Sequence, residues 1–533
     1  MIQKDYDVVV AGSGAAGLTT AIRTASAGLR TLVVEAAEQF GGTTAISGGR
    51  VWVPANGTAA NTGDSPQRAK TYLAQIFDQR WPEFVDTFVD NAQRMRTFIE
   101  AHSFHRFAVC PSYPDYHPAL EGSTAGGRCF DMEIIYLRDL VDEAARVREA
   151  PGYSPIQHSE WEQWRYPDKI DTALLKKRYD DGGRTGGFAL AAALLDGAVR
   201  SGCDVQSGTR LVDVLRTDSA VSSVAIETSS GIETISTRAV VLATGGFDAN
   251  EELRNSLLPI GLSVSAAAPS NTGTALEIAE RLGLPVENVH DGWWMPMAMV
   301  PGETVDGQPH PRGLVRERGV PRSVIINGDG KRFTDEASPY NEFGKAMHMV
   351  DENGHTPNRE AYLIFDEKFR RRYPFPGLTK SGPLPEHVLS APTVSGLARQ
   401  IGVDTNGLCE TIRRWNSFST NGRDRDFHRG ENVYDLYYGD PWASGNPCLG
   451  RIDEAPYYAT RIYSGSIGSK GGITTDTSGH VLGFDGVVSG LFAVGNAAAF
   501  WTGDGYPGPG ATLAVGMVMG LQAGDAIVMR SAR

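Results

Sequence analysis

The strongest constraint on this chain is a glycine pattern near its start, Gly12-Ser-Gly-Ala-Ala-Gly17. An apolar run at 7–11 predicts a buried strand before it, and the Ala- and Leu-rich residues up to Gly28 predict a helix after it. A second apolar run, 31–35, predicts the next strand. This order is a βαβ unit, which indicates a parallel sheet covered by helices.

Each glycine of the pattern has a separate task. Gly12 makes a tight turn, Gly14 lets backbone approach a pyrophosphate, and Gly17 lets the helix pack closely on the strand. The helix N-terminus then faces the phosphates. Glu35 can accept hydrogen bonds from ribose hydroxyls and would repel a ribose 2′-phosphate, which disfavours NADP. We therefore predict an NAD or FAD site, whose turn is completed by Ser13, Ala15 and Ala16.

Later segments complete the α/β alternation. The runs 238–246 and 490–496 each predict a buried strand with a glycine turn, and 511–530 predicts a long Ala-, Gly- and Met-rich helix. From about 287, Trp, Met, Pro and polar loops replace this pattern. We expect an α/β fold, in which a Rossmann-like cofactor-binding domain with a parallel sheet carries an inserted α+β substrate-covering, catalytic domain. The expected bounds are 1–286 with 455–533 for the first domain and 287–454 for the second.

Charge and composition disfavour several classes of protein. The net charge is −13 and Lys and Arg form no cluster, so nucleic acid and anionic membranes are unexpected partners. The five cysteines form no Cys-x-x-Cys pair and the eleven histidines form no ligand pattern, so no metal is expected. We find neither a signal peptide nor an apolar run of membrane-spanning length. We expect a cytoplasmic protein without stable membrane insertion.

Three further segments narrow the choice of cofactor, namely 41–49, 243–246 and 491–496. With them the chain resembles the flavoproteins of the fumarate reductase and 3-ketosteroid dehydrogenase superfamily over essentially its whole length. The resemblance implies FAD, with 41–49 around the ribityl chain and flavin ring and 491–496 beside the ring. Besides the glycine pattern and Glu35, it implies these residues at the FAD: Gly41, Gly42, Thr43, Thr44, Ser47, Gly48, Gly49, Ala243, Thr244, Gly245, Gly495, Asn496, Thr512 and Leu513.

The attachment of the FAD follows from one difference within the superfamily. Members that belong to membrane complexes bind FAD covalently through a histidine in the first of these segments. Thr43 and Thr44 occupy the matching stretch here. We therefore expect FAD to be bound non-covalently.

Three tyrosine motifs, in separate parts of the chain, resemble the 3-ketosteroid Δ1-dehydrogenases. They are Ser338-Pro-Tyr340, Pro114-Asp-Tyr116 and Tyr506-Pro-Gly-Pro-Gly510. The resemblance implies that Tyr340 is the catalytic base and Tyr116 a second active-site tyrosine. It also implies that Tyr506 and Gly510 bind a carbonyl oxygen. Pro509 departs from the family's pattern and stiffens this loop, which leaves the shape of the pocket open.

The chemistry of these residue types agrees with that assignment. A C–H bond next to a ketone is acidic only when the oxygen can bear charge, which hydrogen bonds from Tyr506 and Gly510 would allow. A free phenol has a pKa of about 10, so a tyrosine base needs a partner that lowers it, and Tyr116 is the candidate. Proton transfer to Tyr340 and hydride transfer to flavin N5 would give an α,β-unsaturated ketone. The sequence thus predicts an FAD-dependent dehydrogenase, or desaturase, acting on CH–CH groups.

The substrate and the position of desaturation stay open at this point. Both a 3-ketosteroid and a smaller cyclic ketone of the cyclohexanone type are compatible, with a quinone-like acceptor or oxygen receiving the electrons. The alternative function is a soluble fumarate-reductase-like flavoenzyme acting on an unsaturated acid. That enzyme needs cations to clamp a carboxylate, for which Arg332 and Lys331 are the nearest candidates. Against it, Tyr340 stands where its proton-donating arginine is expected.

Overall fold

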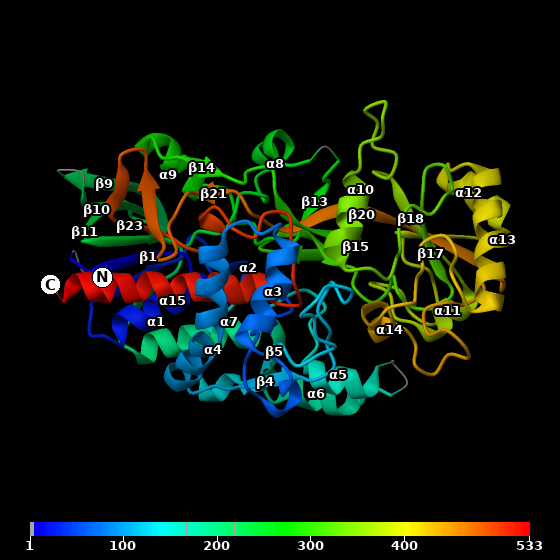
Figure 1. Ribbon diagram of the computed structural model, residues 1–533, viewed down its shortest axis with the longest axis horizontal. Helices are drawn as coiled ribbons and strands as arrows, with labels where there is room; N and C mark the ends of the chain where they lie inside the picture. Colours follow the sequence, from blue (N-terminus) through cyan, green and yellow to red (C-terminus); the bar gives the residue numbers. More distant parts are fainter. Residues whose placement is uncertain (1–4, 166–168, 218–219, 260, 533) are drawn as a thin grey trace.

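Two large sheets organise this computed structural model, which describes residues 5–165, 169–217, 220–259 and 261–532. Figure 1 shows the first sheet at the end of the molecule where both chain ends lie, and the second sheet at the opposite end. Helices α1, α7 and α15 run along the first sheet, whereas α11, α12 and α13 surround the second. The functional residues discussed below come from both ends.

The first sheet has nine strands in the described part of the chain, in the order β11-β10-β23-β12-β1-β2-β8, with β9 beside β10 and β22 beside β23. The strands from β23 to β8 are parallel, and β1 and β2 are buried along their whole length. Continuous Val-rich strands suit this position because helices cover both faces of a parallel sheet. The predicted α/β fold with a parallel sheet is confirmed. The strands are β1 (Val8–Ala11), β2 (Thr31–Val34), β8 (Asp204–Gln206), β9 (Arg210–Thr217), β10 (Ala220–Thr228), β11 (Gly231–Ser236), β12 (Ala239–Leu242), β22 (His480–Gly483) and β23 (Gly486–Ala493).

Helix α15 (Ala511–Ser531) packs directly on α1 (Ala15–Ala25), as Figure 1 shows. A Cβ atom at Gly520 would lie 2.2 Å from the backbone oxygen of Ala16, so only glycine allows this approach. The Thr20 hydroxyl donates to the Gly520 oxygen at 2.9 Å. By length and composition α15 is apolar enough to cross a membrane, but 61% of its most apolar window is buried. It is therefore a core helix that joins the two ends of the chain.

The second sheet has the order β16-β15-β20-β18-β17 among the described residues, and β13 and β19 also pair with β20. Its central strand, β20 (Tyr457–Ser469), pairs antiparallel with β15 and β18. This strand lies beyond residue 454, the expected end of the second domain. The remaining strands are β13 (Val264–Ser265), β15 (Gly292–Val305), β16 (Gln308–Gly313), β17 (Ser323–Asn327), β18 (Ala361–Asp366) and β19 (Val388–Ala391). The helices of this part are α10 (Tyr340–His348), α11 (Glu367–Arg372), α12 (Val394–Ile401), α13 (Thr405–Asn421) and α14 (Val433–Tyr438).

The segment between β2 and β8 adds helices and short strands beside the first sheet. Its three-stranded sheet has the order β3-β5-β4, and the loop after β4 carries Tyr113 and Tyr116. This segment contains α2 (Gly42–Ile46), β3 (Val51–Trp52), α3 (Pro66–Ile76), α4 (Pro82–Ser103), β4 (Phe107–Cys110), β5 (Cys129–Met132), β6 (Ile135–Tyr136), α5 (His158–Trp164), α6 (Thr172–Asp180), β7 (Gly183–Arg184) and α7 (Gly186–Arg200). Four short elements lie elsewhere, namely α8 (Glu251–Leu257), α9 (Thr274–Leu282), β14 (Val286–Glu287) and β21 (Gly472–Ile473).

Candidate active site

The glycine turn between β1 and α1 leaves no room for side chains on its inner side. Gly12 has a φ of +112°, and a Cβ there would lie 2.2 Å from the Ala243 oxygen. A Cβ at Gly17 would lie 2.3 Å from the Gly12 oxygen, so this glycine serves the packing of helix on strand. At Gly14 the nearest atom is the Thr44 hydroxyl oxygen, 3.7 Å away. Gly14 is therefore the position where the backbone faces open space.

Glu35 is buried at the end of β2 and is held by the glycine turn. One of its carboxylate oxygens accepts from the Ser13 backbone N–H at 3.1 Å and from the Ser13 hydroxyl at 2.6 Å. The Ser13 hydroxyl oxygen in turn accepts from the Gly41 N–H at 2.8 Å. These bonds fix the carboxylate while leaving it lone pairs for ribose hydroxyls.

One cavity of about 640 Å³ connects the glycine turn with the tyrosine motifs. Of the residues predicted from the sequence, Gly17 and Gly41 do not line it. All the others do: Gly12, Ser13, Gly14, Ala15, Ala16, Glu35, Gly42, Thr43, Thr44, Ser47, Gly48, Gly49, Tyr116, Ala243, Thr244, Gly245, Tyr340, Gly495, Asn496, Tyr506, Gly510, Thr512 and Leu513. The fold thus brings distant segments of the sequence together around one cavity.

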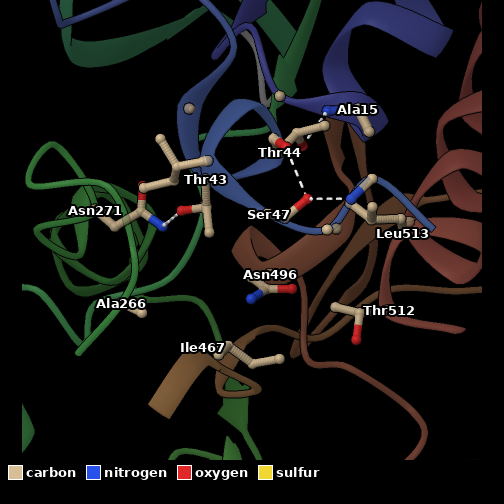
Figure 2. A pocket seen from close by; sticks show the side chains of 18 of the residues that line it. Ala15, Thr43, Thr44, Ser47, Ala266, Asn271, Ile467, Asn496, Thr512 and Leu513 are labelled. Carbon is tan, nitrogen blue, oxygen red and sulfur yellow. Dashed lines mark hydrogen bonds between the residues drawn. The ribbon is translucent and has the colours of Figure 1, made fainter. Parts of the chain in front are cut away.

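The threonines at 43 and 44 organise one side of this cavity (Figure 2). The Thr44 hydroxyl oxygen accepts from the Ala15 N–H at 3.0 Å, and the Thr43 hydroxyl oxygen accepts from the Asn271 side chain at 3.1 Å. In the view of Figure 2, Thr512 lies across the cavity from Asn271. Both threonines act through neutral hydrogen bonds and offer no imidazole for a covalent link to a flavin.

The residues present fit a bound FAD. The cavity combines bare backbone at Gly14, a buried carboxylate at Glu35 and two helix N-termini, those of α1 and α15. Helix N-termini attract phosphate and other anionic groups, and the carboxylate suits ribose. Its volume lies within the usual range for ligand sites.

Three predicted tyrosines meet at the far end of the cavity. The Tyr340 hydroxyl donates to the Tyr506 hydroxyl oxygen at 2.8 Å. The Tyr116 ring lies edge-on to both, with centroid distances of 5.5 Å to Tyr340 and 5.1 Å to Tyr506. Since Tyr506 accepts from Tyr340, its own hydroxyl proton remains available to a ligand.

Burial dominates the acidity of these phenols. It raises the pKa of Tyr506 above its usual value, and hydrogen bonds with Thr512 and Tyr340 partly offset that shift. A phenol that stays protonated is a lasting hydrogen-bond donor. The pKa of Tyr340 is also raised, chiefly by burial and next by the nearby Tyr506. A hydrogen bond with Tyr116 lowers the pKa of Tyr340. Tyr116 is therefore the group that opposes the effect of burial on Tyr340.

Gly510 caps the N-terminus of α15 with a φ of +91°. A Cβ there would lie 2.3 Å from the backbone of Arg50, so another residue would displace a neighbouring segment. Among the described residues, no acceptor is found for the Gly510 N–H. This N–H lies at the positive end of a helix of 21 residues.

Sequence reasoning missed a polar wall of the cavity that includes Arg50, His158 and Arg316. An Arg50 guanidinium nitrogen lies 2.9 Å from His158 Nδ1, and His158 Nε2 lies 2.6 Å from the Tyr437 hydroxyl. Burial, with Arg50 and two further arginines nearby, holds the pKa of His158 well below its usual value. His158 is thus neutral, accepts from Arg50 and donates to Tyr437. These residues follow no periodic pattern in the sequence.

The cations considered for the alternative function lie elsewhere. Arg332 donates to both Glu336 and Asp424, and together with Lys331 it lines a separate cavity of about 490 Å³. Neither lines the cavity with the glycine turn. They are therefore not placed to clamp a carboxylate there.

Comparisons with known proteins identify relatives over nearly the whole chain. Residues 7–513 match the family described as FAD binding domain. The chain is 36% identical over 539 residues to 4-oxocyclohexanecarboxylate 2-dehydrogenase of Sinomonas cyclohexanicum, with 99% of this chain and 93% of that protein covered. It is 35% identical to 3-oxosteroid 1-dehydrogenase of Mycobacterium tuberculosis, with 98% of each covered. The crystal structure of 3-ketosteroid delta1-dehydrogenase from Sterolibacterium denitrificans, in complex with 1,4-androstadiene-3,17-dione, has a TM-score of 0.92 and 33% identity, covering 99% of this chain and 100% of that one.

Fold, cavity and relatives together define a flavoprotein dehydrogenase with FAD as its cofactor. The chain belongs to the FAD binding domain family and, within the fumarate reductase and succinate dehydrogenase superfamily, to the 3-ketosteroid dehydrogenases. It is an FAD-dependent oxidoreductase that acts on CH–CH groups of ketones. The predictions of FAD, of the superfamily and of the enzyme class are confirmed.

A substitution at Gly14 tests the cofactor cradle. Its backbone is extended (φ −73°, ψ 174°), so Gly14→Ala introduces no strain, but the new methyl group lies where the backbone faces the cavity. We expect the dissociation constant of FAD to rise about tenfold, equivalent to about 1.4 kcal/mol, with the melting temperature of the apoprotein unchanged. Flavin fluorescence titration measures the first quantity. Gly328→Ala, at a glycine with no atom within 4 Å, is the control and should bind FAD normally.

Thr43 and Thr44 predict that denaturation releases FAD from the chain. Since Thr43 and Thr44 take the place of a covalently linked histidine, acid precipitation of the holoenzyme should release all of its flavin. The absorbance of the supernatant measures the released flavin. Retention of flavin on the precipitated chain would contradict non-covalent binding.

Proposed function

We propose that this enzyme introduces a C=C bond α,β to the carbonyl group of a ring ketone. The observation that carries the proposal is the hydrogen-bonded pair Tyr340 and Tyr506, at 2.8 Å, on the wall of the cavity that contains the glycine turn. A carbonyl-binding phenol and a candidate base therefore share one substrate position next to the cofactor site.

Tyr506 and Gly510 bind the ketone oxygen. Among the residues that the structure describes, no hydrogen bond is found from the Tyr506 hydroxyl proton or from the Gly510 N–H. The N-terminus of α15 adds positive potential at Gly510. Donors that are fixed before the reaction stabilise charge as it develops on oxygen. The α-carbon of the ketone thereby becomes acidic.

Tyr340 accepts the α-proton. Burial holds its pKa high, so the phenolate is scarce in the free enzyme, and the hydrogen bond with Tyr116 favours its formation. A base with a high pKa also binds the proton firmly once it has been transferred. When bound, FAD would supply the acceptor for the hydride of the β-carbon, and an external quinone-like acceptor or oxygen would take up the electrons.

Within this reaction class, Arg316 favours a ring ketone that carries a carboxylate, such as the substrate named for one relative. Of the arginines that line the cavity, Arg50, Arg210 and Arg312 all donate side-chain hydrogen bonds. Among the described residues, Arg316 has only a distant ion pair with Glu317, at 3.7 Å, and it lies over the Trp161 ring. A guanidinium with spare donors suits a carboxylate. A 3-ketosteroid remains the other candidate, from the names of the steroid relatives.

Removing the Tyr340 hydroxyl tests the base. Tyr340→Phe keeps the ring contacts with Tyr116 and Tyr506, so FAD should stay bound. We expect the rate of anaerobic flavin bleaching by a ring ketone to fall about 10²- to 10⁴-fold, the usual contribution of general base catalysis. Stopped-flow absorbance measures this rate. Near-normal bleaching in the variant would remove Tyr340 from the base role, and bleaching of the wild type by succinate alone would contradict the desaturase.

Replacing Arg316 separates the two substrate candidates. For Arg316→Met we expect the KM for 4-oxocyclohexanecarboxylate to rise about tenfold, since a charged hydrogen bond contributes about 1.5–3 kcal/mol, while the KM for uncharged cyclohexanone stays unchanged. Steady-state kinetics with an artificial electron acceptor measure both. Equal effects on the two ketones, or activity with a 3-ketosteroid alone, would contradict the carboxylate site.

A further inference from the structure

Lys470 is fully buried directly behind the loop that carries Tyr506. It follows β20, and its ammonium group donates to the Gly503 oxygen and, at 3.1 Å, to the Gly505 oxygen. No ion pair joins it to a carboxylate in the described part of the chain. A buried ammonium is costly unless its protons find acceptors. Here those acceptors are two backbone carbonyls of a single loop.

Trp293 extends this contact to the carbonyl-binding phenol. The Lys470 ammonium lies 3.8 Å from the centroid of the Trp293 ring, and that ring lies 4.6 Å from the Tyr506 ring. A cation over an indole face is attracted to it. Ammonium, indole and phenol therefore lie in consecutive contact, with the Trp293 and Tyr506 ring planes tilted by 60°.

The loop needs such contacts because of its composition. It contains glycines at 503, 505, 508 and 510, and glycine gives a chain the greatest conformational freedom. After Tyr506 it is held by the Tyr72 hydroxyl and the Tyr116 N–H, which both donate to the Pro507 oxygen. Before Tyr506 the loop carbonyls accept from Lys470 and, at 3.3 Å, from the Asn341 side chain, which bonds the Asp504 oxygen. The Asp504 carboxylate also forms ion pairs with Lys345, at 3.4 Å, and with Arg80, at 3.8 Å. Lys470 thus provides the closer side-chain contacts of that half of the loop.

We propose that Lys470 is a positioning residue for the carbonyl site, whose ammonium group fixes Tyr506 through the Gly503 and Gly505 oxygens and the Trp293 ring. The inference rests on the proposed function, in which Tyr506 binds the ketone oxygen. When the ammonium loses its charge, the hold on the loop weakens and the carbonyl site loses affinity.

The charge of Lys470 changes in an accessible pH range. Burial lowers its pKa to about 7; Asp291, Asp504 and Glu342 raise it, and Lys345 lowers it further. The ammonium is present below this pH and is lost as pH rises through it. Charge-assisted hydrogen bonds are stronger than neutral ones, so the hold on the loop is stronger below this pH than above it.

A second group that titrates near Tyr506 lies outside this range. His117 Nε2 is 3.1 Å from the Tyr506 backbone oxygen, and burial lowers the pKa of His117 below 6.5. Its titration therefore falls on the acid side of that of Lys470. A change in affinity centred near pH 7 is specific to the lysine.

The test uses oxidised holoenzyme and phenol, a ring whose oxygen takes the place of the ketone oxygen but which cannot be dehydrogenated by loss of adjacent C–H groups. Phenol has a pKa of about 10, so it stays neutral between about pH 6 and 8.5. Its dissociation constant is measured from the change in the visible flavin spectrum. In the wild type we expect this constant to rise about tenfold from pH 6 to 8.5, the effect of losing a charged hydrogen bond. A constant that does not change with pH would overturn the proposal.

Variants separate the charge from the side-chain volume. Lys470→Met should give the weak binding at both pH values, whereas Lys470→Arg, a permanent cation, should give tight binding at both. Lys345→Met is the matched control, because Lys345 pairs with Glu342 and with the carboxylate of the loop residue Asp504, and no described hydrogen bond joins it to the loop carbonyls. It should bind phenol like the wild type at pH 6. Wild-type affinity in Lys470→Met at pH 6 contradicts the proposal.

The two proposals fail in different ways. If ring ketones bleach the flavin but phenol binding is independent of pH, the role of Lys470 is wrong and the dehydrogenase stands. If phenol binding follows the charge of Lys470 but no ketone bleaches the flavin, the positioning role of Lys470 stands and the proposed reaction is wrong. The dissociation constants of phenol for the wild type at the two pH values need no variant. They therefore test the role of Lys470 even if Lys470→Met does not fold.

Discussion

The packing of α15 on α1 is the contact on which the site depends. Because Gly520 has no side chain, the two helices touch through backbone, and their N-termini reach the same cavity. One N-terminus, at Gly14, faces the cofactor side, and the other, at Gly510, faces the tyrosines. Each offers positive potential where negative charge is bound or develops. In the function proposed above, a single helix pair therefore serves both cofactor binding and carbonyl activation.

The aromatic surroundings impose opposite demands on two neighbouring phenols. Burial keeps Tyr506 protonated, which suits a hydrogen-bond donor, but it disfavours the ionised form that the base role proposed for Tyr340 requires. Tyr116 relieves this conflict, since its hydrogen bond acts on Tyr340 while its ring packs on both. The same burial excludes water, which strengthens every electrostatic contact in the site.

The cofactor half of the site could be predicted from sequence because local geometry dictates it. A Cβ atom at Gly12 or Gly17 would lie 2.2 or 2.3 Å from a backbone oxygen, so each position requires glycine. The same requirement recurs wherever this turn is used. Tyr340, Tyr506 and Gly510 stand in short motifs that a resemblance can identify. The roles proposed for Arg316 and Lys470 could not be predicted from the sequence, because they depend on tertiary neighbours such as Trp161 and the Gly503 oxygen. Lys470 also precedes two glycines, and this pattern predicts an exposed turn as readily as a buried contact.

The contact between α1 and α15 forms only when synthesis of the chain is nearly complete. Thr20 and Gly520, joined by a hydrogen bond, are 500 positions apart. At 5–20 residues per second, a ribosome needs roughly 25 to 100 s to make the chain between them. Throughout that interval the nascent α1 presents its glycine turn without the helix that closes the cavity over it. The cavity is therefore completed late in synthesis, and a chain interrupted before α15 lacks the lining residues Thr512, Leu513 and Gly516.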